Sequence, residues 1–123
     1  MIIWGGINNI DFFANGGRYD PARDSWTAVS TANAPDGRSQ HTAVWTGAEM
    51  LVWGGTNLNG AQSSGGRYDP RANTWSSFTS SNAPSPRSGH TAIWTGAEMI
   101  IWGGIGPLNT GGRLGFLSFY RKS

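Results

Sequence analysis

Met-Ile-Ile-Trp-Gly-Gly at residues 1–6 returns as Met-Leu-Val-Trp-Gly-Gly at 50–55 and as Met-Ile-Ile-Trp-Gly-Gly at 99–104. The three copies are 49 residues apart (50 − 1 = 99 − 50 = 49). A fixed period close to fifty residues is typical of repeat architectures, in which each unit buries its apolar faces against its neighbours. The sequence therefore predicts a repeat fold, and its 123 residues hold about 2.5 units.

The complete middle unit, residues 41–89, contains four short segments that favour strands. Its first two segments are apolar on both faces and flank a Gly-containing turn, which is typical of a β-hairpin. We expect these two strands to be covered on both faces, and the fourth, whose polarity alternates, on one face only. The predicted strands are 41–46, 50–53, 65–68 and 75–78, with a turn at 69–73.

Four-stranded antiparallel meanders that pack face to face around an axis form a β-propeller. We therefore predict an all-β fold, a propeller fragment of about 2.5 four-stranded antiparallel blades. The expected units are a partial blade at 1–40 that holds strands two to four and an interblade link, a complete blade with its link at 41–89, and a partial blade at 90–123 with a divergent C-terminal tail. A two-sheet sandwich is the alternative, but it does not account for the constant period.

Four further residues recur at the 49-residue step: a Tyr, a Trp, an Arg and a His. They are Tyr19, Trp26, Arg38 and His41 in the first unit, and Tyr68, Trp75, Arg87 and His90 in the second. Together with the apolar tetrad closed by a Gly pair, this combination resembles the kelch-repeat family, which implies a β-propeller. The segment Trp-Thr-Gly-Ala-Glu-Met further resembles bacterial, often exported, kelch arrays. That resemblance implies a bacterial, secreted protein with an extracellular or periplasmic location.

The last unit departs from the repeat. After Arg113 the expected Tyr-Asp-Pro is replaced by the apolar stretch Leu-Gly-Phe-Leu-Ser-Phe-Tyr-Arg-Lys-Ser. We interpret this tail as a truncated or frame-shifted end; a genuine closing segment that packs on the last sheet is the alternative. Because a closed propeller needs about four blades or more, we interpret the chain as a piece of a larger propeller. Self-association of incomplete blades is the second interpretation.

Composition excludes several classes of function. The chain has no cysteine, which excludes disulfides, thiolate metal sites and a cysteine nucleophile. Its net charge is only +2, and its cationic C-terminal end is too sparse for a phosphate-binding surface, so we expect no nucleic-acid partner. No apolar run is long enough to span a membrane, so we expect no membrane partner, and residues 1–4 run directly into the repeat rather than into a signal peptide.

We expect no catalytic residues, no metal site and no cofactor. His41 and His90 recur with Arg38 and Arg87, and a residue that recurs in every unit is more simply explained by architecture; convergence of the two histidines on a metal is the alternative. For the function, a binding scaffold is the first interpretation, and a fragment of a kelch-fold enzyme, oxidase-like or sialic-acid-epimerase-like, is the alternative. Copper radical oxidases of this fold need a cysteine crosslinked to a tyrosine, so the catalytic centre of such a parent would lie outside this chain.

The repeats differ most in the loops between the second and third strands, at 7–15, 56–64 and 105–110. Amide-rich loops suit the recognition of peptides or of sugar hydroxyls, and loops commonly carry function. We therefore predict a non-catalytic scaffold that binds protein or glycan through this loop-rich face; solvated loops without a ligand are the alternative. The expected ligand-binding residues are Asn8, Asp11, Asn57, Asn59 and Gln62.

Overall fold

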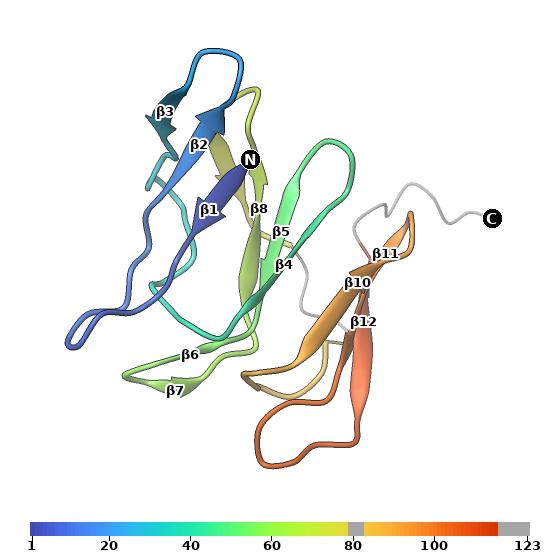
Figure 1. The fold of residues 1–123 in the computed structure, drawn as a ribbon. Coiled ribbons are helices and arrows are strands. Elements are labelled where there is room, and N and C mark those ends of the chain that lie inside the picture. The colour runs from blue at the N-terminus through green and yellow to red at the C-terminus, as the bar shows by residue number, and fades with distance from the viewer. Residues whose placement is uncertain (79–82, 116–123) are drawn as a thin grey trace.

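The computed structural model describes residues 1–78 and 83–115, and its strands form three blade-like antiparallel sheets and one short hairpin (Figure 1). The first sheet contains β1 (Ile2–Trp4), β2 (Gly16–Asp20) and β3 (Ser25–Ala28). The second contains β4 (Thr42–Trp45), β5 (Met50–Trp53), β8 (Gly65–Asp69) and β9 (Thr74–Ser76). The third contains β10 (Thr91–Trp94), β11 (Glu98–Trp102) and β12 (Gly111–Gly115), and the hairpin is β6 (Thr56–Asn57) with β7 (Gly60–Ala61).

The second sheet is the predicted four-stranded meander, in the order β4-β5-β8-β9. The first sheet, β1-β2-β3, has no strand in the place that β4 takes in the second. The prediction of an all-β fold built from antiparallel, blade-like sheets is therefore confirmed. Strand positions agree with the sequence to within two residues; the largest difference is β9, which ends at Ser76 rather than at residue 78.

The turn between the first two strands is held by a threonine. In the second sheet the Oγ1 atom of Thr46 accepts hydrogen bonds from the backbone N–H groups of Ala48 and Glu49. Thr95 makes the same pair of bonds in the third sheet. A threonine hydroxyl that binds nearby backbone N–H groups offers the chain a turn in place of a continued strand. The repeated Thr-Gly-Ala-Glu segment therefore indicates a β-hairpin turn.

The first glycine of the pair after β1 and of the pair after β5 is required by the close approach of a histidine ring. Gly54 has φ = 74°, in the left-handed region that favours glycine. A Cβ at this position would lie 2.5 Å from the Cε1 atom of His90. Gly5 stands in the same relation to His41, with a corresponding separation of 2.7 Å. Gly5 and Gly54 therefore recur together with the histidine of the next unit, because the ring occupies the space that a Cβ would need.

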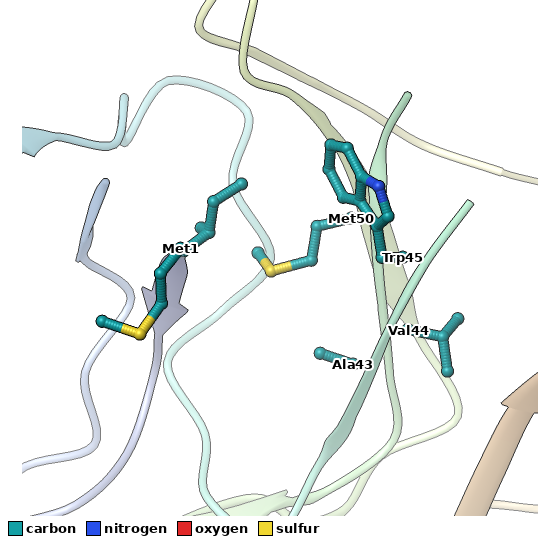
Figure 2. Close-up of a pocket in the computed structure, with 6 residues that line it drawn as sticks. Met1, Ala43, Val44, Trp45 and Met50 are labelled. Atoms are coloured by element: carbon teal, nitrogen blue, oxygen red, sulfur yellow. The ribbon is translucent and has the colours of Figure 1, made fainter. Parts of the chain in front are cut away.

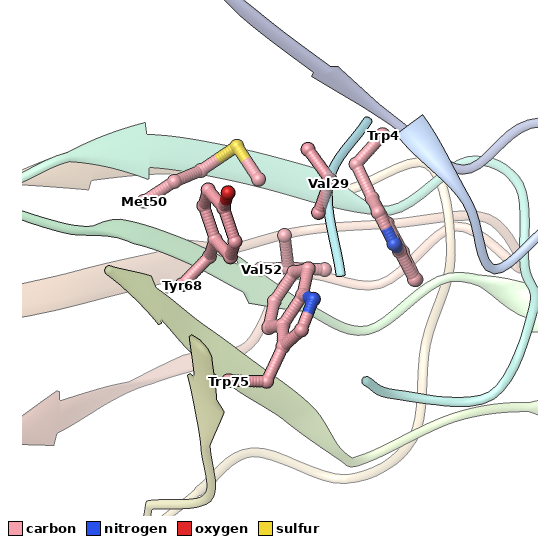
Figure 3. Packing of buried hydrophobic residues seen from close by; sticks show 6 residues of the cluster. All are labelled: Trp4, Val29, Met50, Val52, Tyr68 and Trp75. Carbon is pink, nitrogen blue, oxygen red and sulfur yellow. The ribbon is translucent and has the colours of Figure 1, made fainter. Parts of the chain in front are cut away.

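The hydrophobic core lies between the sheets and not within any one of them. One cluster fills the space between the first and second sheets, as Figure 3 shows; it consists of Trp4, Val29, Met50, Val52, Tyr68 and Trp75. A second cluster lies between the second and third sheets and consists of Leu51, Trp53, Met99, Ile101 and Leu114. Alternate residues of β5 enter opposite clusters, which explains why all four of its residues are buried.

The expectation that the first two strands of a unit are covered on both faces is correct for β5 and wrong for β4. Ala43 and Trp45 of β4 are exposed, while Thr42 and Val44 are half-buried. The physical reason is the missing neighbour: β10 lies beside β4 on one side, whereas the described residues supply no corresponding strand in the first sheet. Apolar composition alone did not distinguish a buried strand from one that lacks its neighbour.

Candidate functional site

The three variable loops emerge at one end of the sheets, and the turns at Gly47 and Gly96 lie at the opposite end (Figure 1). The interblade link around Arg38 joins the first two loops: Arg38 N–H donates to the carbonyl of Phe13, and Ser39 forms a bridge with Thr56. The link around Arg87 joins the last two loops in the same way, through Arg87 N–H to Gln62 and Ile105 N–H to Ser88. The end of the molecule that carries 7–15, 56–64 and 105–110 is therefore one continuous hydrogen-bonded surface, which we call the loop face.

A buried arginine supports the base of the second loop. Arg38 is 1% exposed, and its Nη1 atom donates to the carbonyl oxygens of Gly54 at 3.0 Å and Ser64 at 2.7 Å. Its Nη2 atom reaches the Ser64 hydroxyl at 3.1 Å, and its Nε atom reaches the carbonyl of Asp36 at 2.9 Å. Burial lowers the pKa of Arg38, and the charge of Asp36 partly opposes that shift. The arginine thus holds the two ends of the loop together.

Arg87 repeats this arrangement one unit later. Its Nη1 atom donates to the carbonyl oxygens of Gly103 at 3.0 Å and Thr110 at 2.7 Å, and its Nη2 atom reaches the Thr110 hydroxyl at 3.1 Å. The serine of one loop is thus replaced by a threonine that offers the same hydroxyl. The third loop is shorter than the second, yet its two ends are held at the same distances. The arginines therefore position the loop face independently of loop length.

The two histidines contribute to the packing of one blade on the next. The Nε2 atom of His90 lies 2.8 Å from the Thr42 hydroxyl, and its ring packs edge-on against Trp53 with centroids 5.1 Å apart. His41 packs against Trp4 in the same way, with centroids 5.3 Å apart. Burial lowers the pKa of both rings, that of His90 to about 4. Over residues 1–78 and 83–115, no group of three or more His, Asp or Glu side chains is placed to hold a metal ion.

The lowered pKa of His90 makes stability depend on pH. The unfolded chain binds a proton at His90 below the ordinary pKa of 6.5, whereas the folded protein does so only near 4. Between these values the unfolded state binds more protons, so the free energy of unfolding should fall as the pH drops from about 6.5 to about 4. Urea unfolding at several pH values measures this fall. His90→Gln, which cannot titrate, should flatten the pH dependence, and an unchanged slope in that variant would contradict the assignment.

Three of the five predicted ligand-binding residues turn out to shape their own loops. The Oδ1 atom of Asn8 accepts hydrogen bonds from the backbone N–H groups of Ile10 and Asp11, at 2.8 and 2.6 Å. Asn57 donates to the carbonyl of Gly37 at 2.9 Å. Its Oδ1 atom accepts from Asn59 N–H at 2.9 Å and from the side chain of Gln62 at 3.2 Å. Asn57 therefore uses both its donor and its acceptor, whereas Asn8 uses its oxygen and Gln62 its nitrogen.

The side chains of Asp11 and Asn59 remain exposed on the loop face, and no hydrogen bond joins either of them to another described residue. They belong to adjacent loops that share the link around Arg38. The structure thus separates the five predicted residues into three that build the loops and two that are presented to solvent. Repetition could have indicated this division, because Asn8 and Asn57 occupy equivalent positions in successive units (57 − 8 = 49).

Sequence reasoning missed the apolar residues of the loops. Each of the three loops exposes at least one aliphatic side chain to a large extent: Ile7 is 53% exposed and Ile10 78% in the first, Leu58 89% in the second and Ile105 62% in the third. A large aliphatic residue in an otherwise polar loop is itself a signal, because nothing in the loop conformation requires it. Exposed apolar groups rimmed by polar ones are typical of interaction surfaces. The loop face therefore combines four exposed aliphatic side chains with the polar side chains of Asp11 and Asn59.

Among the residues that the structure describes, none forms a helix long and apolar enough to cross a membrane. A comparison with curated proteins found no match. The family model described as the KLHDC2/KLHL20/DRC7 Kelch-repeats domain matches residues 1–120 of the chain. This match agrees with the blade-like sheets, the Gly pairs and the recurring arginines and histidines described above. The chain belongs to the family of KLHDC2/KLHL20/DRC7-type Kelch-repeats domains.

Proposed function

We propose that this chain is a non-catalytic kelch-repeat scaffold that binds a protein partner through its loop face. Kelch-repeat domains are generally protein-interaction scaffolds. The observation that carries the proposal is the exposure of at least one aliphatic side chain on each of three loops that are joined by backbone hydrogen bonds. Apolar contacts surrounded by polar groups are the usual anatomy of a protein–protein interface.

The side chains of the loop face favour a protein over a glycan. Sugar hydroxyls need free hydrogen-bond partners in the protein, and an amide has a limited number of donors and acceptors. Asn57 uses its nitrogen on the interblade link and its oxygen within the second loop, Gln62 uses its nitrogen within that loop, and Asn8 uses its oxygen within the first. Leu58 and Ile10, by contrast, are available to enter an apolar pocket of a partner.

A peptide-display selection on the intact chain tests this proposal. We expect the affinity of selected peptides to fall at least about tenfold in Leu58→Asp, because a charged group would replace an apolar contact. Ala48→Asp is the matched control, since Ala48 is exposed on the opposite end of the second sheet and its replacement should leave binding unchanged. Thermal unfolding of both variants checks that they remain folded.

The reverse pattern, in which Ala48→Asp abolishes binding and Leu58→Asp does not, would place the site at the hairpin turns and contradict the proposal. A glycan array tests the second ligand class. Glycan binding that survives Leu58→Asp but is lost in Asn59→Ala would favour recognition of a sugar by polar groups. The extracellular or periplasmic location and the lack of catalysis stay predictions from the sequence.

A further inference from the structure

The dipeptide Asn-Gly occurs twice in the chain, at Asn15–Gly16 and at Asn59–Gly60. An asparagine side chain carries an amide carbon that the backbone nitrogen of the next residue can attack. A following glycine hinders this attack least, because it has no Cβ. Both asparagines are exposed, so exposure does not distinguish them. The backbone around them does, and it determines which of the two reacts in the folded chain.

The attack requires a rotation of the backbone at the asparagine. The glycine nitrogen reaches the Cγ atom only after the peptide group between the two residues has turned about the Cα–C bond of the asparagine. That turn also moves the carbonyl oxygen of the asparagine. Hydrogen bonds on either side of the peptide group therefore slow the reaction, because they have to open first.

The first sheet holds the peptide group between Asn15 and Gly16 from two sides. The carbonyl oxygen of Asn15 accepts a hydrogen bond from Gly5 N–H at 3.0 Å, and that of Gly16 accepts one from Val29 N–H at 3.0 Å. A Cβ on Gly16 would collide with the carbonyl oxygen of Ile3, so the backbone has little room to turn. Cyclisation at Asn15 therefore requires the opening of the first sheet.

Asn59 and Gly60 lie instead at the turn of the β6–β7 hairpin, which is separate from the three blade sheets (Figure 1). This hairpin has only two residue pairs, Thr56 with Ala61 and Asn57 with Gly60. A two-stranded hairpin on its own is marginally stable in water. The pair that closes the turn therefore opens at a lower cost in free energy than a strand of a blade.

The surroundings of Asn59 leave the reacting groups accessible. No described residue donates a hydrogen bond to its carbonyl oxygen, and a Cβ on Gly60 would meet no atom within 4 Å. The bond that restrains Asn59 is the one from its own N–H to the Oδ1 atom of Asn57, at 2.9 Å.

The reaction needs no binding pocket, because both reacting groups belong to the chain. A groove of about 340 Å³, shown in Figure 2, lies between β1 and the β4–β5 hairpin. It is lined by Met1, Ile2, Ala43, Val44, Trp45 and Met50. Neither asparagine is among these residues, so the groove does not shield Asn59 from water.

We propose that Asn59 is a site of spontaneous deamidation and that the first sheet protects Asn15 from the same reaction. The Gly60 nitrogen loses its proton to hydroxide and forms a bond to the Cγ atom of Asn59. The bond from Cγ to the side-chain nitrogen breaks, and this nitrogen takes a proton from water and leaves as ammonia. Water then opens the cyclic imide at either of its carbonyl carbons, which gives aspartate or isoaspartate.

Either product changes the tip of the second loop. A carboxylate replaces a neutral amide next to Leu58, which is 89% exposed. Isoaspartate also lengthens the backbone by a methylene group, which disturbs the pairing of Asn57 with Gly60. The loop face therefore acquires a negative charge with time. The modification itself does not rest on the binding function proposed for this face.

Incubation of the intact chain in mildly alkaline buffer, followed by peptide mapping with mass spectrometry, measures the rate at each asparagine. We expect Asn59 to react at least about tenfold faster than Asn15, because the hairpin opens more readily than the sheet. The same incubation in urea is the control. There both dipeptides are unfolded and the two rates should be similar, which assigns the difference to the structure and not to the local sequence.

Equal rates at the two asparagines of the folded chain would overturn the proposal, and so would protection of Asn59 as strong as that of Asn15 relative to urea. Asn57→Ala removes the hydrogen bond that restrains Asn59 and should raise its rate about threefold or more. The rate at Asn15 in this variant should stay unchanged, which checks that the first sheet remains folded. An unchanged rate at Asn59 would contradict control of the reaction by the turn.

Discussion

Replacement of Arg38 by Met should lower the free energy of unfolding by about 3 kcal/mol or more. The side chain is 1% exposed, and Met fills much of its volume but donates no hydrogen bond. The Gly54 carbonyl and the Ser64 side chain would lose the partner that holds the two ends of the second loop together. A buried acceptor without a partner costs about 1–3 kcal/mol. Urea unfolding followed by tryptophan fluorescence measures the loss.

Two matched variants decide whether this loss comes from the buried hydrogen bonds. Arg87→Met removes the equivalent set of bonds in the next unit and should cost a similar amount. Arg71→Met removes an exposed arginine in the turn between β8 and β9 and should change stability by less than about 0.5 kcal/mol. A loss below about 1 kcal/mol for Arg38→Met, comparable with the Arg71 variant, would show that the loop ends do not depend on the guanidinium.

Trp75→Ala should cost about 3–5 kcal/mol of stability. Trp75 is 4% exposed and packs on Trp4 and Tyr68 at centroid separations of 5.4 and 5.2 Å. Its Nε1 atom also donates to the carbonyl of Ser30 at 2.8 Å, which joins the second sheet to the link that precedes it. The substitution therefore removes a large apolar group and a hydrogen bond from the same interblade contact.

Trp26→Ala is the control for this prediction, because Trp26 occupies the same repeat position one unit earlier. It is 54% exposed and contacts Tyr19 at 5.0 Å. We expect its removal to cost no more than about 1 kcal/mol. If Trp75→Ala prevents folding, Trp75→Phe retains most of the ring and should still be measurably less stable than Trp26→Phe. Equal costs for the two alanine variants would show that Trp75 is not an interblade anchor.

The sequence alone determined the repeat, the strand positions and the structural character of the recurring residues. The 49-residue step and the Gly pairs predicted the blades, because a turn that needs glycine and a strand that needs apolar faces leave strong local signals. The recurring histidines and arginines were attributed to architecture, and the structure shows them packing blades together and closing the loop ends.

The composition of the loop face was decided only by the tertiary structure. Asn8, Asn57 and Gln62 were expected to bind a ligand, which stays a prediction, and each of them also forms hydrogen bonds that shape its own loop. Whether a side-chain amide is free to bind a ligand depends on which backbone atoms the folded loop brings within hydrogen-bond distance. The residue type alone does not indicate this. The exposed aliphatic residues Leu58 and Ile10 were missed for the complementary reason, since an apolar residue type does not reveal that the surrounding chain leaves it uncovered.

Burial of equivalent residues likewise depends on neighbouring sheets and not on local sequence. Trp26 and Trp75 occupy the same place in the repeat, yet one is 54% and the other 4% exposed. Ile3 and Val52 differ in the same way, because Val52 faces the first sheet whereas no described sheet covers the face of the first sheet that carries Ile3. In a repeat fold each unit buries its faces only against the next unit. The sequence therefore determined which residues are able to pack between blades, and the tertiary structure decided which of them have a blade to pack against.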